Sequence, residues 1–153
     1  MSLEKDFKRF ACASLLKRAS TTTRVMLNNA IEAYTYARCG DTFMAEMMLT
    51  GFEGALSSLR ALLEKTRERC TEYWEEIGLS CEMPNGDCEC DVVDTGIKAI
   101  EDMIKNVDEL LSMRVEDINT KALKMSTYLE EIDVKLRNLL AGLNCTTTIK
   151  SGD

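Results

Sequence analysis

The alternation of apolar and polar positions predicts long amphipathic helices, most clearly between residues 41 and 77. Apolar residues recur there at steps of three and four, the spacing of one buried helix face. They are Met44, Met48, Phe52, Ala55, Leu59, Leu62, Leu63, Cys70, Trp74 and Ile77. A helix of this length runs roughly 55 Å and cannot bury its apolar face against itself. The segment therefore needs helical neighbours.

The same spacing predicts helices on both sides of this segment. Gly40 suits a left-handed cap at the end of a preceding helix, and Asp41 suits the N-cap of the next one. Together they predict a tight αα-hairpin. Later apolar residues mark a third and a fourth helix, and they are Ile97, Ile100, Ile104, Val107 and Leu111, then Ile118, Ala122, Met125, Leu129, Ile132, Leu136, Leu139, Leu140 and Leu143.

The fold class that follows is all-α: one domain spanning 1–153, an antiparallel bundle of about four long helices with a Cys-rich loop, 78–91, between helices two and three. The expected helices are 4–38, 41–77, 92–112 and 115–143. The hydroxyl-rich run Ser20–Thr23 either kinks the first helix or starts a new one, which would make 1–19 a separate helix. Residues 112–117 are either a turn or a polar helical turn that fuses the last two helices. The polar tail, 146–153, is expected to fray.

A hairpin that turns at Gly40 pairs positions whose numbers add to about 80, if the two helices are straight. Asn29 and Ala30 then face Gly51, and Met26 faces Gly54. Small residues at these positions predict a close approach of the two backbones. The alternative is a ligand pocket that the missing side chains open.

Charge is distributed unevenly along the chain. The net charge is −7, which argues against nucleic acid as the default partner. Residues 1–40 carry seven Lys and Arg against three Asp and Glu, a net +4, whereas residues 41–153 carry −11. We expect the basic segment to dock on acidic helices of its own or a neighbouring chain. Binding of nucleic acid by this segment is a weaker alternative, because no aromatic side chains are interleaved with its cations. Those cations are Lys5, Lys8, Arg9, Lys17, Arg18 and Arg24.

The location expected from the sequence is the cytoplasm, with no membrane partner. No run of eighteen apolar residues is present to span a bilayer. The first eighteen residues mix charges into their apolar positions, unlike the apolar core of a secretory signal. Without export, the glycosylation sequon at Asn144 is interpreted as accidental.

Seven cysteines and no histidine define the candidate chemistry. The turn Pro84–Gly86 can bring Cys81 back toward Cys88 and Cys90, and Cys70 can add a fourth sulfur for zinc or an iron–sulfur cluster. The spacing matches no strong metal motif. A metal site, a disulfide and free thiols all stay open. We expect Cys81 to lie within bridging distance of Cys88 or Cys90, as a disulfide in preference to a metal site. Cys12 and Cys39 are interpreted as small core residues.

Two functional hypotheses remain, because no nucleophile–histidine pair, phosphate loop or dinucleotide fingerprint is present. The first is a non-catalytic helical protein, a complex subunit or adaptor, which self-associates or binds a protein partner through long amphipathic helices and a surface rich in methionine. The alternative is a magnesium-dependent nucleotide phosphohydrolase. It would use a Glu-x-x-Glu and a Glu-x-x-Asp pair, formed by Glu72, Glu75, Glu130 and Asp133. No cofactor is expected from the sequence, and zinc at the Cys-rich loop is the alternative.

Overall fold

The predicted all-α bundle is confirmed by a computed structural model. The structure describes residues 3–77, 92–114 and 117–151, and it describes the side chains of all of these except 77, 92–94 and 144–151. No strand occurs in these residues. They form four long helices and one short helix: α1 (Leu3–Arg38), α2 (Thr42–Leu49), α3 (Phe52–Ile77), α4 (Val92–Leu111) and α5 (Ile118–Ser151).

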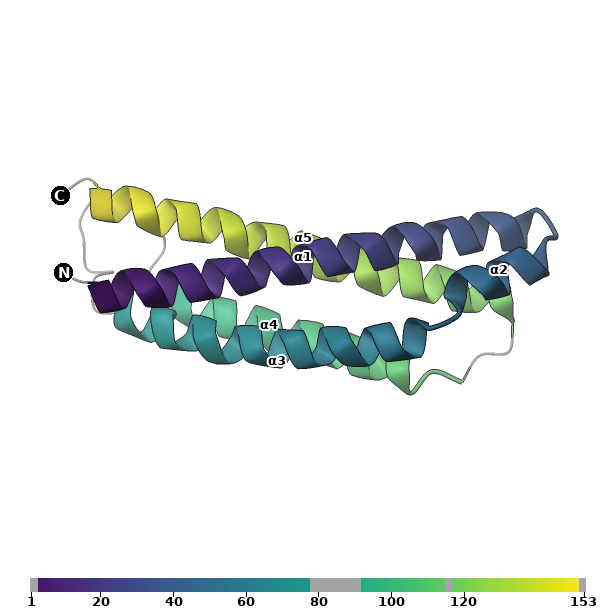
Figure 1. The fold of residues 1–153 in the computed structure, drawn as a ribbon, viewed down its shortest axis with the longest axis horizontal. Coiled ribbons are helices and arrows are strands. Elements are labelled where there is room, and N and C mark those ends of the chain that lie inside the picture. Colours follow the sequence, from purple (N-terminus) through teal and green to yellow (C-terminus); the bar gives the residue numbers. More distant parts are fainter. Residues whose placement is uncertain (1–2, 78–91, 115–116, 152–153) are drawn as a thin grey trace.

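The long helices run alternately up and down the bundle (Figure 1). α1 packs against α5 and α3, and α4 packs against the other sides of α3 and α5. α1 and α4 are therefore at opposite corners, as are α3 and α5. The first residues of α1 and the last residues of α5 lie at the same end of the bundle. An antiparallel arrangement of this kind is typical of helical bundles.

The hairpin between α1 and α2 forms as predicted. Gly40 takes a left-handed conformation, with φ of 86°. Its N–H donates to the carbonyl of Ala37, and the N–H of Asp41 donates to the carbonyl of Tyr36, the two bonds of a Schellman cap. The Asp41 carboxylate then accepts the N–H of Met44 at 3.1 Å and begins α2.

The prediction of one helix over 41–77 is wrong, because the helix is interrupted at Thr50 and Gly51. Thr50 is extended, with ψ of 131°, and Gly51 has φ of 85°. Neither conformation can continue a helix. The expected role of the two glycines in close packing against α1 is wrong too. Gly51 and Gly54 are exposed, and a Cβ built on either would meet no atom within 4 Å.

The first helix is not divided at Ser20–Thr23, since α1 is continuous from Leu3 to Arg38. Both Ser20 and Thr23 lie on its buried face. The last two helices do not fuse: α4 ends at Leu111, and Asp117 caps the start of α5 by accepting the N–H and the hydroxyl of Thr120 at 3.1 and 2.7 Å. These bonds lower the pKa of the Asp117 carboxyl. α5 continues as a helix through 146–151, part of the tail that was expected to fray.

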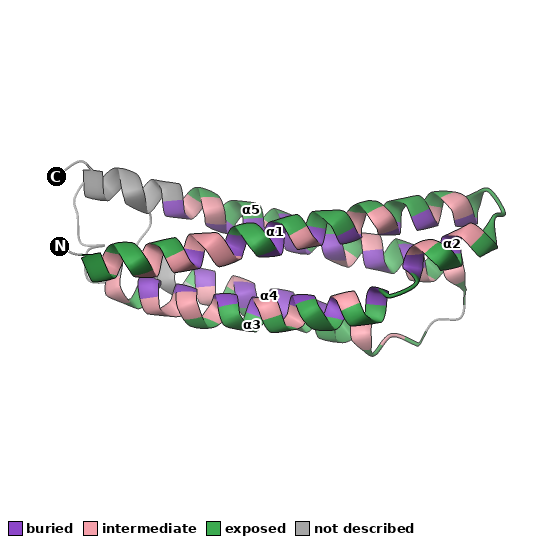
Figure 2. Ribbon diagram, viewed as in Figure 1, coloured by how far each residue is buried: buried purple, intermediate pink, exposed green. Residues whose placement is uncertain are grey.

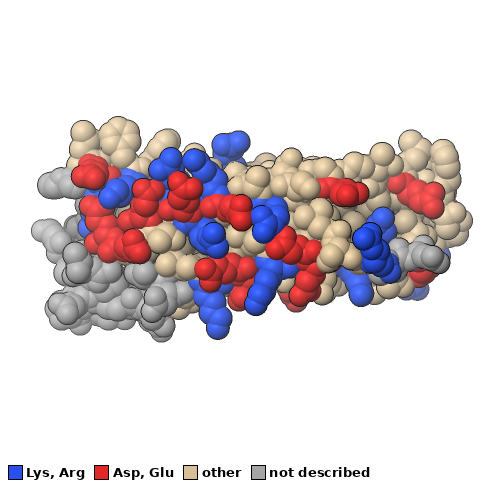
Figure 3. Space-filling view, turned by 90° about the horizontal axis from the view of Figure 1, so that it is seen from below, with Lys and Arg blue, Asp and Glu red and all other residues tan. Residues whose placement is uncertain are grey.

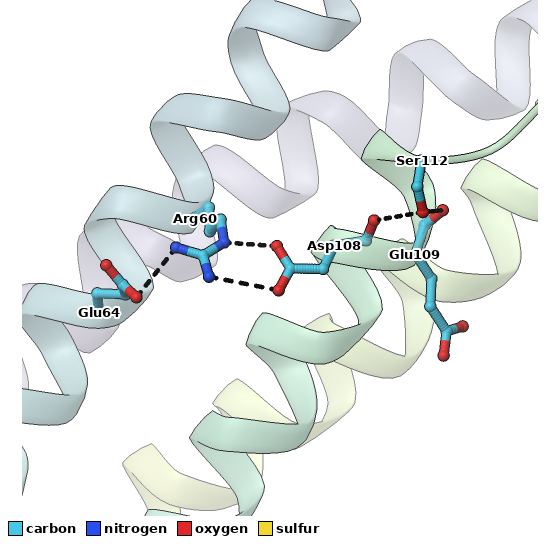
Figure 4. Close-up of polar contacts among 5 residues, drawn as sticks. All are labelled: Arg60, Glu64, Asp108, Glu109 and Ser112. Carbon is cyan, nitrogen blue, oxygen red and sulfur yellow. Dashed lines mark hydrogen bonds and ion pairs between the residues drawn. The ribbon is translucent and has the colours of Figure 1, made fainter.

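α3 and α4 approach each other closely at Gly96. A Cβ on this glycine would lie 2.8 Å from the ring of Trp74, so the indole packs directly on the backbone of α4. Ion pairs span the outer side of the same two helices. The Arg60 guanidinium contacts Asp108 on α4 and Glu64 one turn along α3 (Figure 4). Figure 3 shows acidic and basic side chains interspersed over much of this face. Such a pattern is typical of a solvated surface.

Candidate functional site

The outer face of α1, at the end of the bundle where the chain begins, carries an exposed apolar stripe of three residues. Leu3, Phe7 and Phe10 are 75, 66 and 70% exposed. Their spacing of four and three places them on one side of the helix. Exposed apolar side chains gathered on one side of a helix are a typical mark of an interaction surface. We call these three residues the α1 stripe.

The α1 stripe lies on the side of the helix opposite to the core. Residues are ~100° apart around a helix, which puts the α1 stripe ~180° from Cys12, Leu16 and Ala19. Those three residues are fully buried against the other helices. The side of α1 that faces away from the bundle is exposed along most of its length (Figure 2). The α1 stripe therefore contributes nothing to the core.

The spacing of Leu3, Phe7 and Phe10 alone does not show on which side of α1 they lie, because the same spacing also fits a buried face. The series of apolar positions further along the helix does show it. Steps of three and four traced backward from Met26 reach Thr23, Ala19, Leu16 and Cys12, and these are the buried positions. Phe7 and Phe10 do not belong to that series.

A disulfide holds this part of α1 on the bundle. Cys12 Sγ is bonded to Cys70 Sγ on α3, and both residues are fully buried. One turn before Cys12, the Lys8 ammonium lies 2.9 Å from the Glu76 carboxylate, also on α3. That hydrogen bond raises the pKa of Lys8. The disulfide and the ion pair thus both fix the helix that carries the α1 stripe to α3.

The disulfide corrects two of the cysteine predictions. Cys70 cannot serve as a fourth metal ligand while its sulfur is bonded to Cys12, so it leaves the proposed ligand set. Cys12 is a core residue as expected, but as half of a disulfide. Cys39 was also assigned to the core, and this was wrong because it is an exposed free thiol. The predicted bridge between Cys81 and Cys88 or Cys90 lies outside the described residues.

The basic segment docks within its own chain at two points. Lys8 pairs with Glu76 on α3, and Arg24 Nε lies 3.5 Å from Asp133 on α5. Lys5 and Arg9 are partly buried, whereas Lys17 and Arg18 are exposed and point away from the bundle. The expectation of docking on acidic helices is therefore met at Lys8 and Arg24, and Lys17 and Arg18 remain available on the outer face.

The four carboxylates of the phosphohydrolase hypothesis do not form one site. Glu72 and Glu75 lie on α3, and Glu130 and Asp133 lie on α5 at the opposite corner of the bundle. Asp133 is buried between α1 and α5, where the guanidinium groups of Arg24 and Arg137 neutralise it. Glu72 pairs with Arg69 at 3.1 Å. Among the described side chains, no three Cys, Asp or Glu residues are placed to hold a metal ion together.

A second, smaller apolar patch lies on α2, at the other end of the bundle. Phe43 and Met47 are 69 and 54% exposed. Met44 and Met48 are only partly exposed, so the methionine-rich surface expected from the sequence is reduced to Met47 in this segment.

Comparison with known proteins returned no match to any family model, any curated protein or any solved structure. Within the described residues, no helix combines the length and the apolar character needed to cross a bilayer.

Proposed function

We propose that this protein is a non-catalytic helical bundle that associates with another protein chain, either a second copy or a different partner, through the outer face of α1. The observation that carries the proposal is the α1 stripe. Exposing two phenylalanines and a leucine on a helix whose opposite face already fills the core is costly in water, and a partner chain would remove that cost. The rigid attachment of α1 to α3 favours the same interpretation, because a preorganised surface loses little entropy on binding.

The partner in this proposal is a protein. A nucleic acid is less favoured, since of the six cations in the basic segment two already pair with carboxylates of the bundle. The cytoplasm expected from the sequence stays a prediction. The Cys12–Cys70 disulfide counts against it, because such bonds persist mainly in oxidising compartments.

The test is photo-crosslinking in the cells from which the chain comes. A benzophenone amino acid replaces Phe10 in one variant and Phe43 in a matched control, which is equally exposed at the other end of the bundle. We expect a discrete protein adduct from position 10 and none from position 43. Absence of any adduct from position 10, in protein that remains folded, would overturn the proposal.

A further inference from the structure

We infer that the partner of the α1 stripe is a second copy of this chain, packed antiparallel along the outer face of α1. This inference rests on the proposed function and names its occupant. The observation behind it is the pattern of charges on both sides of the α1 stripe. When two copies of α1 run in opposite directions, the acidic residues of each copy lie opposite the basic residues of the other.

Charged side chains of opposite sign border the outer face at its two ends. Glu4 and Asp6 lie beside the beginning of the α1 stripe, where the Glu4 carboxylate is also 3.6 Å from the Lys8 ammonium of its own helix. Lys17 and Arg18 lie three to four turns further along. At ~100° per residue, Glu4 and Arg18 fall on one side of the stripe, and Asp6 and Lys17 fall on the other. On both sides of the α1 stripe, the charged residue nearer the start of the helix is therefore acidic and the later one is basic.

Two-fold symmetry brings these borders together. When two helices pack face to face and antiparallel, a dyad places the same side of each helix on the same side of the interface. A register in which paired positions add to about 22 places Glu4 opposite Arg18 of the second copy and Asp6 close to Lys17 of the second copy. Each contact occurs twice. A parallel arrangement would instead place acid on acid and base on base.

The apolar residues between these two rows of charges fit the same register. Phe7 faces the turn that contains Ser14, and Phe10 lies beside its symmetry mate near the dyad. Ser14 is small and half-buried, so it leaves room for an aromatic ring. Leu3 reaches the aliphatic stems of Lys17 and Arg18, which can cover apolar surface while their charged ends stay in water. The apolar residues of each copy thus meet small or aliphatic groups of the other.

The same charges argue against an anionic membrane as the occupant. The outer face between Leu3 and Arg18 carries two acidic and two basic residues at its borders, so it has no excess positive charge to attract acidic lipids. The contact is also short: sixteen residues of helix extend ~24 Å, which gives an interface below the standard size of ~800 Å² per partner. We therefore expect a reversible dimer whose population depends on concentration.

The experiment is sedimentation equilibrium of the purified full chain over about three decades of concentration. The wild type is expected to pass from monomer to dimer. Glu4→Arg and Arg18→Glu each place like charges opposite one another, and each should raise the dissociation constant roughly tenfold. The combined swap, Glu4→Arg with Arg18→Glu, restores opposite charges and should recover most of the lost affinity. Lys98→Glu on α4 is the matched control, because it reverses an exposed charge away from α1 and should leave the constant unchanged.

Each outcome separates this inference from the proposed function. A swap that is no better than either single reversal overturns the antiparallel register. A dimer whose dissociation constant is unchanged by every α1 substitution overturns the assignment of the interface to the outer face of α1. A wild type that stays monomeric at every concentration overturns the second copy as occupant. In that case a crosslink from position 10 to a different protein would still support the proposed function, and the absence of any crosslink would remove both.

Discussion

The sulfur atoms of Cys12 on α1 and Cys70 on α3 are bonded to each other, directly behind the face that carries Phe10. The two cysteines are 58 residues apart in sequence, so the bond closes a loop that includes the whole hairpin. Together with the contact between Lys8 and Glu76, it fixes the beginning of α1 on the bundle. The exposed α1 stripe is therefore part of a rigid surface.

Removal of this disulfide should lower the free energy of unfolding substantially. For a closed loop of this length, the chain-entropy model gives a loss of about 4 kcal/mol for Cys12→Ala with Cys70→Ala. Denaturation by urea measures the change, and Cys39→Ala serves as the control because Cys39 is exposed and unpaired. Peptide mapping of the non-reduced protein that finds Cys12 and Cys70 as separate thiols would contradict this account.

Two glycines three residues apart should respond in opposite directions to the same substitution. Gly51→Ala forces a side chain into a left-handed conformation and should destabilise the protein by about 1–2 kcal/mol. Gly54→Ala lies inside α3, where its Cβ meets open space, and should stabilise by about 0.5–1 kcal/mol. Equal effects in thermal or urea unfolding would show that the helix break at Thr50–Gly51 is absent in solution.

The contact between Gly96 and Trp74 gives a prediction that fluorescence can follow. Gly96→Ala places a methyl group 2.8 Å from the indole ring, so Trp74 or α4 must shift. We expect a loss of about 1–3 kcal/mol of stability. Because Trp74 is the single tryptophan, its emission should move toward that of a more solvated indole. An unchanged spectrum with unchanged stability would mean that the two helices are further apart than the structure places them.

The N-cap of α5 should contribute more to stability while Asp117 is ionised than after its carboxyl is protonated. Its pKa in the folded state is lowered below the ordinary value of 3.8, because the carboxylate accepts two hydrogen bonds from Thr120. The stabilisation is therefore present above pH 3.8 and is lost as the pH falls through the lower folded value. The melting temperature of Asp117→Ala should be a few degrees below that of the wild type at neutral pH, and the gap should narrow in acid. Asp117→Asn should keep most of the cap at neutral pH, since asparagine is an equally good N-cap. A gap that stays constant with pH would assign the effect to something other than the carboxylate.

The sequence was sufficient for the bundle and for its hairpin, because these depend on local rules. Gly40 and Asp41 end one helix and begin the next through their own backbone and side-chain hydrogen bonds. The break at Gly51 was not predicted, because apolar residues with helical spacing continue across it. That spacing does not determine the backbone dihedral angle φ of the glycine. The disulfide was missed for a different reason. Cys12 and Cys70 meet only when α1 and α3 pack in one particular register, and spacing along the chain does not encode that register.

The sequence spacing alone could not show that the α1 stripe is exposed. Leu3, Phe7 and Phe10 have the spacing of a buried face, and only the series of buried residues from Cys12 to Ala37 shows that they point outward. The basic residues were found from composition, but composition could not divide them into Lys8 and Arg24, which pair within the chain, and Lys17 and Arg18, which face outward. That division depends on how α1 is oriented about its own axis relative to α3 and α5, which composition does not show.

The most direct test of the central claim uses the four phenylalanines of the chain, which act as two probes and two references. In protein labelled with 4-fluorophenylalanine, the fluorine signals of Phe7 and Phe10 report the α1 stripe, exposed Phe43 is the solvated reference, and Phe52, which is 5% exposed, is the buried reference. The measurement is the shift of each signal between H₂O and D₂O as the protein concentration rises. We expect the solvent shift of Phe7 and Phe10 to fall toward that of Phe52 while Phe43 keeps its full shift. Phe7 and Phe10 signals that stay as solvated as Phe43 at every concentration would contradict self-association through the outer face of α1.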